Sequence, residues 1–252
     1  MSSDIQIKLN DLKLESSKVG LKINVRKTKE MRINTTSTEH LCFLGHQVER
    51  VEEFTYLGSI IAEDGGTLRY VQNRIKKALG TYTQLRKVWS SNTYSLSTKI
   101  HIYKACVLSV LLYGCETWLV TEAIQNKLRV FVNRCLRRIL KVFWPNKITN
   151  EQLWARTEMY DINIEIRKRK FGWIGHTLRK PPDEICHQAL VYNPQGSRKR
   201  GRPKNTWRRS VLGEINTLSS RLGRTYNSIG ELKEEAVRRN RYRNLVDDLY
   251  PV

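Results

Sequence analysis

The sequence lacks any hydrophobic run long enough to cross a bilayer. Its longest apolar segment, Ala105 to Tyr113, is interrupted by Ser109, whereas a membrane-spanning helix needs about 20 apolar residues. The first residues, MSSDIQIKLND, contain no charged segment followed by an apolar one, as a secretory signal would. We therefore expect an intracellular protein, nuclear or cytoplasmic, that is not secreted and has no membrane partner.

Closely paired cysteines are also missing. The chain has five, an odd number without a CxxC pair, which argues against both a disulfide framework and a zinc finger. His176, Cys186 and His187 lie near one another in the sequence, but no fourth ligand stands at a usable spacing. We expect reduced, mostly buried thiols and no metal site.

Acidic residues are scarce. The 252 residues include 24 Asp and Glu against 45 Lys and Arg, a formal net charge of +21. Residues 164–209 hold 13 of the basic residues and only 3 of the acidic ones. Such an excess predicts a polyanionic partner, and without a membrane segment that partner is expected to be nucleic acid.

The hydrophobic pattern changes along the chain. Ile5, Leu9, Leu12 and Val19 predict a helix that ends at Gly20. Segments rich in β-branched and aromatic residues then predict short strands, with Gly45 and His46 closing a hairpin. These strands are expected at Leu21–Val25, Lys29–Ile33, Leu41–Phe43, Val48–Val51 and Phe54–Ile61.

From Thr67 onward the pattern is helical. Helices are expected at Thr67–Trp89, Ser97–Gly114, Thr121–Phe143, Ile148–Thr157, Asp161–Lys180, Lys204–Arg221 and Ile229–Leu249. The predicted fold class is therefore α+β and mainly α: short N-terminal antiparallel strands, a helical bundle and a basic helical C-terminal region. We place the domains at residues 1–66, 67–145 and 146–252.

The helix expected at Thr121–Phe143 combines an apolar face with a basic stripe. The apolar residues recur at steps of three and four and share one face: Ile124, Leu128, Phe131, Cys135, Ile139 and Val142. Beside that face, Lys127, Arg134, Arg138 and Lys141 fall in a narrow arc that suits a phosphate backbone. The alternative is an ordinary solvated helix face.

The helix expected at Asp161–Lys180 places an aromatic ring among cationic groups. Arg169, Trp173, His176 and Lys180 lie at steps of four, three and four. Such a face suits base stacking combined with phosphate binding. The alternative is that Trp173 is a core residue, as most tryptophans are.

The segment SRKRGRPKNTWRR at Ser197–Arg209 is the most basic in the chain. Its candidate contacts with nucleic acid are Arg198, Lys199, Arg200, Arg202, Lys204, Arg208 and Arg209. The centre, Arg-Gly-Arg-Pro, resembles AT-hook peptides, whose extended backbone lets arginines enter a narrow minor groove. The alternatives are a nuclear-localisation patch and a solvated linker before a helix anchored by Trp207.

Asp247 and Asp248 stand side by side in a helical pattern, so we interpret them as structural and not as metal ligands.

Two N-terminal segments follow one another in a recognisable order: GLKINVRKTKEM at Gly20–Met31 and FTYLGSII at Phe54–Ile61. Together they resemble the end of the reverse-transcriptase palm of non-LTR (LINE-type) retrotransposons. LLYGCETW, RKRKFGWIGHTLRK and RKRGRPKNTWRR further along resemble the thumb and C-terminal region of RTE-like elements. The resemblance covers nearly the whole chain.

This resemblance implies a part in RNA-templated DNA synthesis primed at a chromosomal nick. By position, Lys27 matches a motif lysine near the incoming nucleotide, where it would assist proton transfer to pyrophosphate. Phe54, Tyr56, Leu57 and Gly58 match the primer grip. The helices from Thr67 to Phe143 would form the thumb, and Arg167–Arg209 would bind target DNA or element RNA.

The sequence departs from the family in lacking the catalytic aspartates. The expected Mg²⁺ ligands, the fingers and the Tyr-x-Asp-Asp hairpin would all belong to an upstream palm, so no cofactor is expected here. We expect the C-terminal part of an endonuclease/reverse-transcriptase polyprotein, inactive alone, that binds element RNA, a primer–template hybrid or target DNA, with the upstream region as another partner. The alternative is a stand-alone DNA- or RNA-binding module with an AT-hook-like segment.

Overall fold

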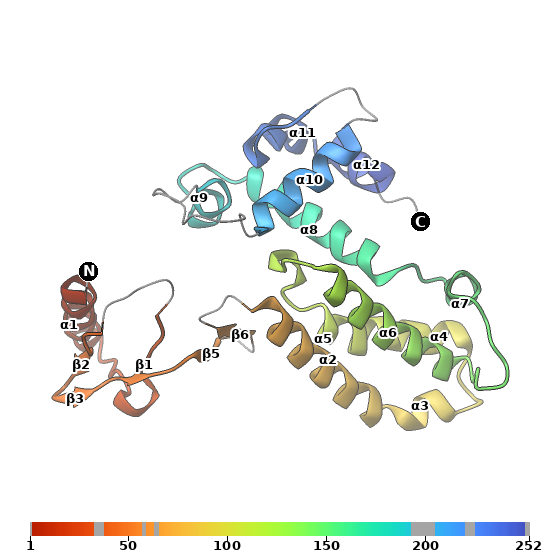
Figure 1. Cartoon of the computed structure of the whole chain (residues 1–252), viewed down its shortest axis with the longest axis horizontal. Coiled ribbons are helices and arrows are strands. Elements are labelled where there is room, and N and C mark those ends of the chain that lie inside the picture. Colours follow the sequence, from red (N-terminus) through yellow and green to blue (C-terminus); the bar gives the residue numbers. More distant parts are fainter. Residues whose placement is uncertain are drawn as a thin grey trace. The chain divides into compact units, whose positions relative to one another are not determined.

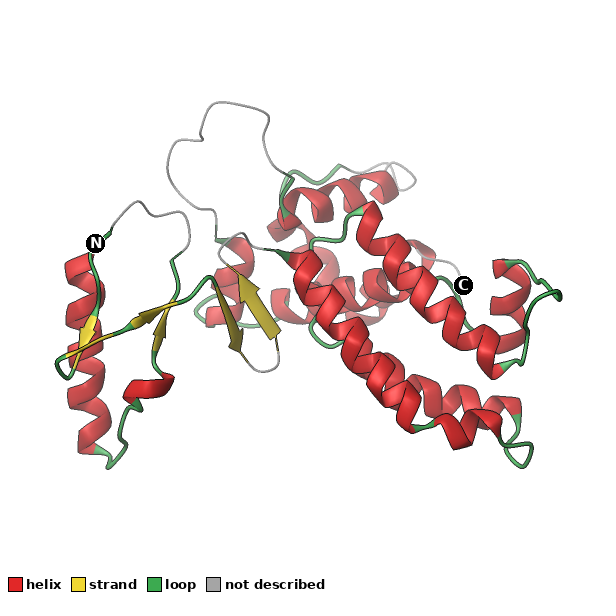
Figure 2. Ribbon diagram, turned by 60° about the horizontal axis from the view of Figure 1, so that its bottom comes forward, coloured by secondary structure: helices red, strands yellow, loops and turns green. Residues whose placement is uncertain are grey.

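The computed structural model describes residues 2–32, 38–56, 59–62, 66–192, 205–219 and 225–249. The chain forms two compact units, an N-terminal unit (Met1–Tyr70) and a helical unit (Val71–Val252). Figures 1 and 2 show a mainly helical protein whose described strands all lie in the N-terminal unit, which confirms the expected α+β, mainly α class. The domain boundaries expected at residues 66 and 145 stay predictions.

Helix α1 (Ser2–Lys18) ends as its sequence predicts. Gly20 has a φ of +75°, and the Leu21 N–H donates to the Ser16 carbonyl over 2.9 Å, which closes the helix in a Schellman motif. The apolar face of α1 is only partly covered. Leu9 packs against a small cluster formed by Leu41, Phe43 and Val48, whereas Ile5, Leu12 and Val19 are exposed.

The strands form three separate two-stranded sheets. The elements are η1 (Val25–Lys27), β1 (Lys29–Glu30), β2 (Cys42–Phe43), β3 (His46–Gln47), β4 (Glu49–Arg50), β5 (Glu53–Tyr56) and β6 (Ser59–Ala62). Pairs β2–β3 and β5–β6 are antiparallel, as expected. Pair β1–β4 is parallel, so the expectation of antiparallel strands throughout was wrong for this pair.

Two predicted strands were wrong for identifiable reasons. The segment Leu21–Val25 runs into the short turn η1 instead, because the Asn24 side chain accepts a hydrogen bond from the Lys27 N–H (3.1 Å) and favours the turn. The segment Phe54–Ile61 forms the two strands β5 and β6, with Tyr56 opposite Ser59. The expected hairpin is present, but its turn residues are Leu44 (φ 54°) and Gly45 (φ 78°), both left-handed as a type I′ turn requires, whereas His46 already belongs to β3 and pairs with Phe43.

The remaining elements are helical. They are α2 (Thr67–Gln84), α3 (Arg86–Ser90), α4 (Leu96–Ile102), the π-helical η2 (Tyr103–Leu108), α5 (Ser109–Leu111), η3 (Cys115–Thr117), α6 (Glu122–Ile139), α7 (Asn150–Thr157), α8 (Ile162–Leu178), α9 (Ile185–Val191), α10 (Trp207–Ser219), η4 (Ile229–Leu232), α11 (Lys233–Val237) and α12 (Arg239–Leu249). The helix expected at Thr67–Trp89 divides at Leu85, and that expected at Ile229–Leu249 divides at Arg238. Helix α9 was not predicted. No helix within the described residues combines the length and the apolar composition needed to cross a membrane.

Helix α6 buries the apolar face that its sequence predicts. Five of the six expected residues are buried: Ile124, Leu128, Phe131, Cys135 and Ile139. The sixth, Val142, is half-buried beyond the end of the helix. Across the same core, the Trp89 indole stacks on Tyr82 with ring centroids 5.2 Å apart, and Tyr82 Oη donates to the Cys135 carbonyl (3.3 Å). These contacts fix which side of α6 faces outward.

A second core surrounds α8. Phe171, Ile174 and Leu178 are buried and pack against residues of α9 to α12. The Tyr242 hydroxyl donates to the Phe171 carbonyl over 2.8 Å, so α12 is tied to the backbone of α8. The Lys168–Asp247 ion pair (3.1 Å) joins the same two helices, which agrees with a structural role for Asp247.

The expectation that most thiols are buried was wrong, since only Cys115 and Cys135 of the five are buried and Cys186 is half-buried. Burial raises the pKa of the Cys115 and Cys135 thiols to about 12, whereas Cys42 and Cys106 are exposed. Because the thiolate is the reactive form, we expect iodoacetamide at pH 8 to modify Cys115 and Cys135 at least about 100-fold more slowly than Cys42 and Cys106. Peptide mass spectrometry checks this, with urea-unfolded protein as the control. Equal rates in the native protein would contradict the two buried positions.

Candidate nucleic-acid interface

Helix α6 presents a basic row, but the row is shorter than predicted. At its start, the Thr121 Oγ1 accepts from the Ile124 N–H (3.4 Å). At its end, Lys141 has a φ of 57°, and the Val142 N–H donates to the Arg137 carbonyl (2.9 Å), so the helix stops before Lys141. The placement of Lys141 on the helical arc was therefore wrong. Its ammonium group instead donates to Asn92 Oδ1 (2.6 Å).

The other three residues of the predicted stripe, Lys127, Arg134 and Arg138, are exposed on one side of α6. Within the described part of the chain, the guanidinium groups of Arg134 and Arg138 form no hydrogen bond or ion pair. Cationic groups without an internal partner keep their full charge for an external anion.

A groove of about 520 Å³ runs beside this row, between α6 and the segment that leads to α7. We call it the arginine groove, and its lining consists of Arg129, Val130, Asn133, Arg134, Arg137, Arg138, Val142, Phe143, Trp144 and Asn150. Four of these ten residues are arginines, and among the described residues no acidic side chain lines the groove. A cleft lined by charges of one sign concentrates counter-ions, so the groove favours an anionic ligand.

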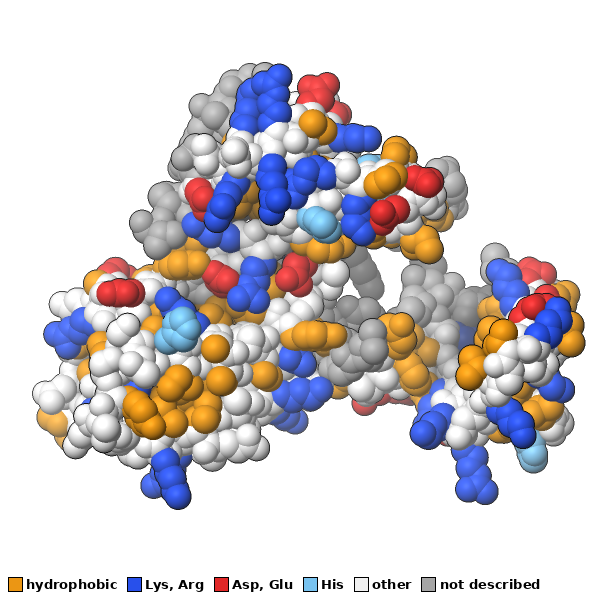
Figure 3. Space-filling model, turned by 180° about the vertical axis from the view of Figure 1, so that it is seen from behind, with side chains coloured by type: hydrophobic (Ala, Val, Ile, Leu, Met, Phe, Trp, Pro, Cys, Tyr) orange, Lys and Arg blue, Asp and Glu red, His pale blue; other side chains and the backbone are white. Residues whose placement is uncertain are grey.

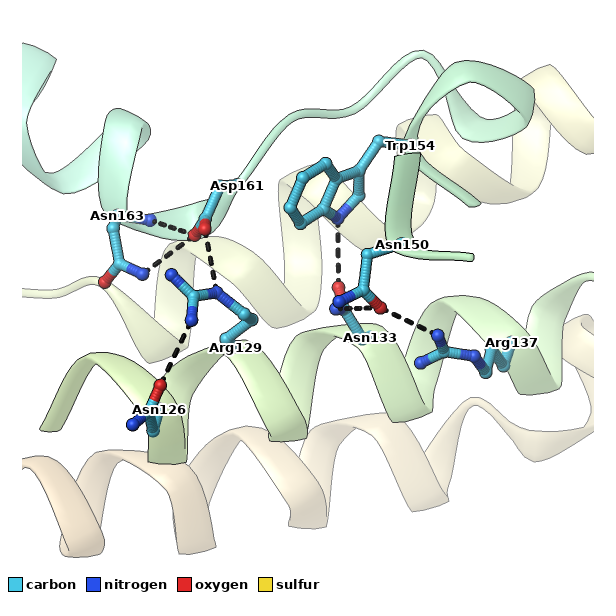
Figure 4. A network of polar contacts seen from close by, with 8 residues as sticks. All are labelled: Asn126, Arg129, Asn133, Arg137, Asn150, Trp154, Asp161 and Asn163. Atoms are coloured by element: carbon cyan, nitrogen blue, oxygen red, sulfur yellow. Dashed lines mark hydrogen bonds and ion pairs between the residues drawn. The ribbon is translucent and has the colours of Figure 1, made fainter. Parts of the chain in front are cut away.

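Arg129 is held in place at one end of the groove (Figure 4). Its Nε donates to Asp161 Oδ2 over 2.8 Å, and its Nη1 donates to Asn126 Oδ1 over 3.1 Å. The same Asp161 is the N-cap of α8, where Oδ1 accepts from the Asn163 backbone N–H (2.9 Å). One carboxylate thus begins α8 and orients a groove arginine, whose charge it partly offsets.

Arg137 is held by a second part of the same network (Figure 4). Its Nη2 donates to Asn150 Oδ1 (2.7 Å), an oxygen that also accepts from Asn133 Nδ2 (3.0 Å). The Trp154 indole N–H in turn donates to Asn133 Oδ1 (3.0 Å). The groove therefore contains two arginines fixed by neighbours, Arg129 and Arg137, beside Arg134 and Arg138, which have no partner in the described part of the chain.

Two large aromatic side chains stand at the groove. Phe143 is 59% exposed and Trp144 is 84% exposed, although aromatic rings usually bury much of their surface. The segment that carries them is fixed at both ends: Val142 closes α6, and the Thr149–Gln152 capping box begins α7. The aromatics are thus presented beside the arginines by a short, anchored segment.

Reasoning from the sequence missed Arg129, Arg137, Phe143 and Trp144. The two arginines lie outside the narrow arc of the stripe, and only the three-dimensional path of the segment after α6 brings the aromatics to them. A usable signal was present in the letters VFWPN, which place two adjacent aromatics directly after a basic helix.

The basic face predicted on α8 is largely occupied by internal contacts. Trp173 is half-buried against the second core and meets Trp207 edge-to-face at 6.1 Å, which favours its core interpretation. Arg169 Nε pairs with Glu165 (2.7 Å) and Lys180 with Glu184 (2.9 Å). Burial opposes ionisation of Glu165, but hydrogen bonds from Tyr160 and Arg169 outweigh it and lower its pKa.

His176 is exposed, and Figure 3 shows blue basic and red acidic side chains interspersed over the region of α8 to α12. Arg208 donates to the carbonyls of Val191 and Tyr192 and so closes the end of α9, which leaves it less available to a ligand. Arg209 is exposed. The other candidates of the basic segment lie outside the described residues: Arg198, Lys199, Arg200, Arg202 and Lys204.

The residues matched to polymerase motifs lie in the N-terminal unit. Lys27 is exposed at the end of η1. On β5, Phe54 is half-buried and Tyr56 is 57% exposed. Leu57 and Gly58 lie outside the described residues.

The structure brings no metal-binding cluster together in its described part. No three His, Cys, Asp or Glu side chains gather there in a way that would hold a metal ion. The buried His187 ring lies 3.3 Å from the Thr177 carbonyl, and the Cys186 thiol donates to Glu184 (3.5 Å).

Comparisons with known proteins found one similar protein and one matching domain family. An uncharacterized protein of Caenorhabditis elegans, described as transposon-derived, is 25% identical over 219 residues, which span 83% of this chain and 78% of that relative. This similarity indicates a transposable-element origin. A domain of unknown function, DUF6451, matches residues 81–113, from the end of α2 to just beyond α5. No solved structure matches the chain.

Proposed function

We propose that this chain is a nucleic-acid-binding protein of transposable-element origin and that the arginine groove is its phosphate-binding site. The main support is that Arg134 and Arg138, whose guanidinium groups have no partner among the described residues, line the same groove as the exposed aromatics Phe143 and Trp144. Guanidinium groups bind phosphate through charge-assisted hydrogen bonds, and aromatic rings stack on bases.

The net charge of +21 supports the same conclusion, because it attracts polyanions over a distance before any specific contact forms. The fixed arginines, Arg129 and Arg137, add to the positive potential of the groove and form part of its wall. Arg134 and Arg138 supply the direct phosphate contacts.

The finer proposal is that the chain is the C-terminal part of a non-LTR retrotransposon reverse transcriptase. In this proposal the N-terminal unit is the end of the palm, with Lys27 and the β5 residues Phe54 and Tyr56 in its motifs, and the helices α2 to α6 are the thumb. The supports are the order of the sequence motifs and the similarity to the transposon-derived relative. The partners would be element RNA, a primer–template hybrid or target DNA, together with the upstream polymerase region.

We expect Arg134→Ala/Arg138→Ala to weaken binding to labelled nucleic acid by about 10- to 100-fold at 50 mM salt, since each lost charged hydrogen bond contributes about 1 kcal/mol or more. The slope of log affinity against log salt should shrink by about 2, one for each lost phosphate contact. Fluorescence anisotropy with single-stranded RNA, duplex DNA and a primer–template hybrid measures both quantities.

The matched control is Lys76→Ala/Arg86→Ala, which removes the same charge from exposed positions on α2 and α3. An equal loss in both double variants would contradict a site and leave only a general effect of net charge. Arg200→Ala/Arg202→Ala tests the alternative of an AT-hook-like module: a loss confined to A·T-rich duplex would assign binding to that segment instead.

A further inference from the structure

We propose that the arginine groove selects single-stranded nucleic acid over duplex, by stacking a base on Trp144 while Arg134 and Arg138 hold the adjoining phosphates. This inference rests on the proposed function and adds to it the class of ligand. Its basis is that exposed aromatic rings and arginines line the same groove, and it does not require the resemblance to a polymerase.

Exposed aromatic rings line the groove beside its arginines. Trp144 exposes 84% of its surface, and its neighbour Phe143 exposes 59%. Both line the groove together with Val130, which is 58% exposed and adds an apolar surface beside the arginines. A π-face next to cationic groups matches a single strand, in which each unstacked base adjoins a charged phosphate.

A duplex lacks the free base face that the aromatic rings of the groove would bind. Bases in a duplex are already stacked on one another and present only their edges in the grooves, so a duplex offers phosphates to Arg134 and Arg138 but no free base face to Trp144. Only a strand with an accessible base engages both parts of the groove. A duplex is therefore expected to bind through charge alone.

Hydrogen bonds anchor the segment that carries the aromatic rings. The network that fixes Arg137 through Asn150 and Asn133 also fixes the first residue of α7, and the capping box at Thr149 holds that end of the aromatic segment. A segment whose backbone is anchored on both sides before binding loses less conformational freedom when a base stacks on its ring. An acidic peptide would also be drawn to the arginines, but its carboxylates do not use the aromatic faces.

The test uses the full chain and a 12-nucleotide strand that carries 2-aminopurine, as DNA and as RNA, each also annealed to its complement. We expect Trp144→Ala to weaken single-strand binding about tenfold, since stacking contributes about 1–3 kcal/mol per base. The 2-aminopurine quenching should disappear, the salt slope should stay the same, and duplex binding should change less than about twofold. The matched control is Tyr94→Ala, which removes a 47% exposed aromatic from the same helical unit outside the groove.

The inference is overturned if Trp144→Ala leaves single-strand binding and quenching intact, if it weakens duplex binding equally, or if polyglutamate competes as well as the oligonucleotide at equal charge. Arg134→Ala/Arg138→Ala in the same assay distinguishes failure of the single-strand inference from failure of the proposed phosphate site. A loss with that variant but none with Trp144→Ala overturns only the single-strand inference. No loss with either variant overturns the proposed site as well. If Trp144→Ala weakens binding of one strand, DNA or RNA, more than the other, the more affected strand is the natural ligand.

Discussion

Replacing Gly175 by alanine is expected to lower the free energy of unfolding of the helical unit by about 3 kcal/mol, the cost of overpacking a tight core contact. A Cβ at this position would lie 2.3 Å from Cε1 of Tyr242. The tyrosine cannot move aside freely, because it is 4% exposed and its hydroxyl donates to the Phe171 carbonyl. Urea unfolding followed by circular dichroism measures the loss.

Gly172 on the same helix provides the control. It is exposed, and a Cβ there meets nothing within 4 Å, so Gly172→Ala should stabilise the unit by about 0.5–1 kcal/mol through helix propensity alone. Opposite signs for two identical substitutions three residues apart would locate the close approach of α12 to α8. A stabilising effect of Gly175→Ala would show that α12 does not pack there.

The helical faces could be predicted from the sequence because helical period alone decides them. The steps of three and four that place Ile124, Leu128 and Ile139 on one side of α6 are local properties, and the structure buries all three. Capping is equally local, as Thr121 and Gly20 show: each acts on backbone groups within its own turn.

The candidate site could be predicted only in part, since it depends on contacts distant in sequence. Arg134 and Arg138 were found because they share an arc of α6. Arg129 is oriented by Asp161, 32 residues away, and Arg137 by Asn150, 13 residues away, and neither contact leaves a periodic signal. Trp144 follows the helix in a loop, where periodicity has no meaning.

The N-terminal strands show the opposite limit. Strands of two residues carry too little pattern to fix their length or partner, so β-branched composition suggested a strand at Leu21–Val25 that a local turn replaced. The parallel pairing of β1 with β4 joins Lys29 to Glu49 across 20 residues. Strand direction depends on that path and not on the residues that pair.

Removing the charge of Glu214 is expected to cost the helical unit about 3 kcal/mol of stability, because it leaves a buried ammonium without its counter-ion. Lys170 on α8 is 1% exposed, and its Nζ lies 2.9 Å and 3.2 Å from the two carboxylate oxygens of Glu214 on α10. Glu214 itself is 19% exposed, so water offsets part of the loss, and the value lies at the lower end of what breaking a buried pair costs. Urea unfolding of Glu214→Gln tests this.

Two further variants separate the charge from the packing. Lys170→Met/Glu214→Met removes both charges and keeps an unbranched side chain at each position, so it should recover most of the lost stability, because no unpaired charge remains. Glu184→Gln removes the partner of Lys180 on the surface of the same unit and should leave the unfolding curve unchanged. If Glu214→Gln also left the curve unchanged, the ammonium of Lys170 would have to reach water, and α10 could not lie over it as described. The expected order, with the double variant more stable than the single one, holds only if α8 and α10 enclose this charge.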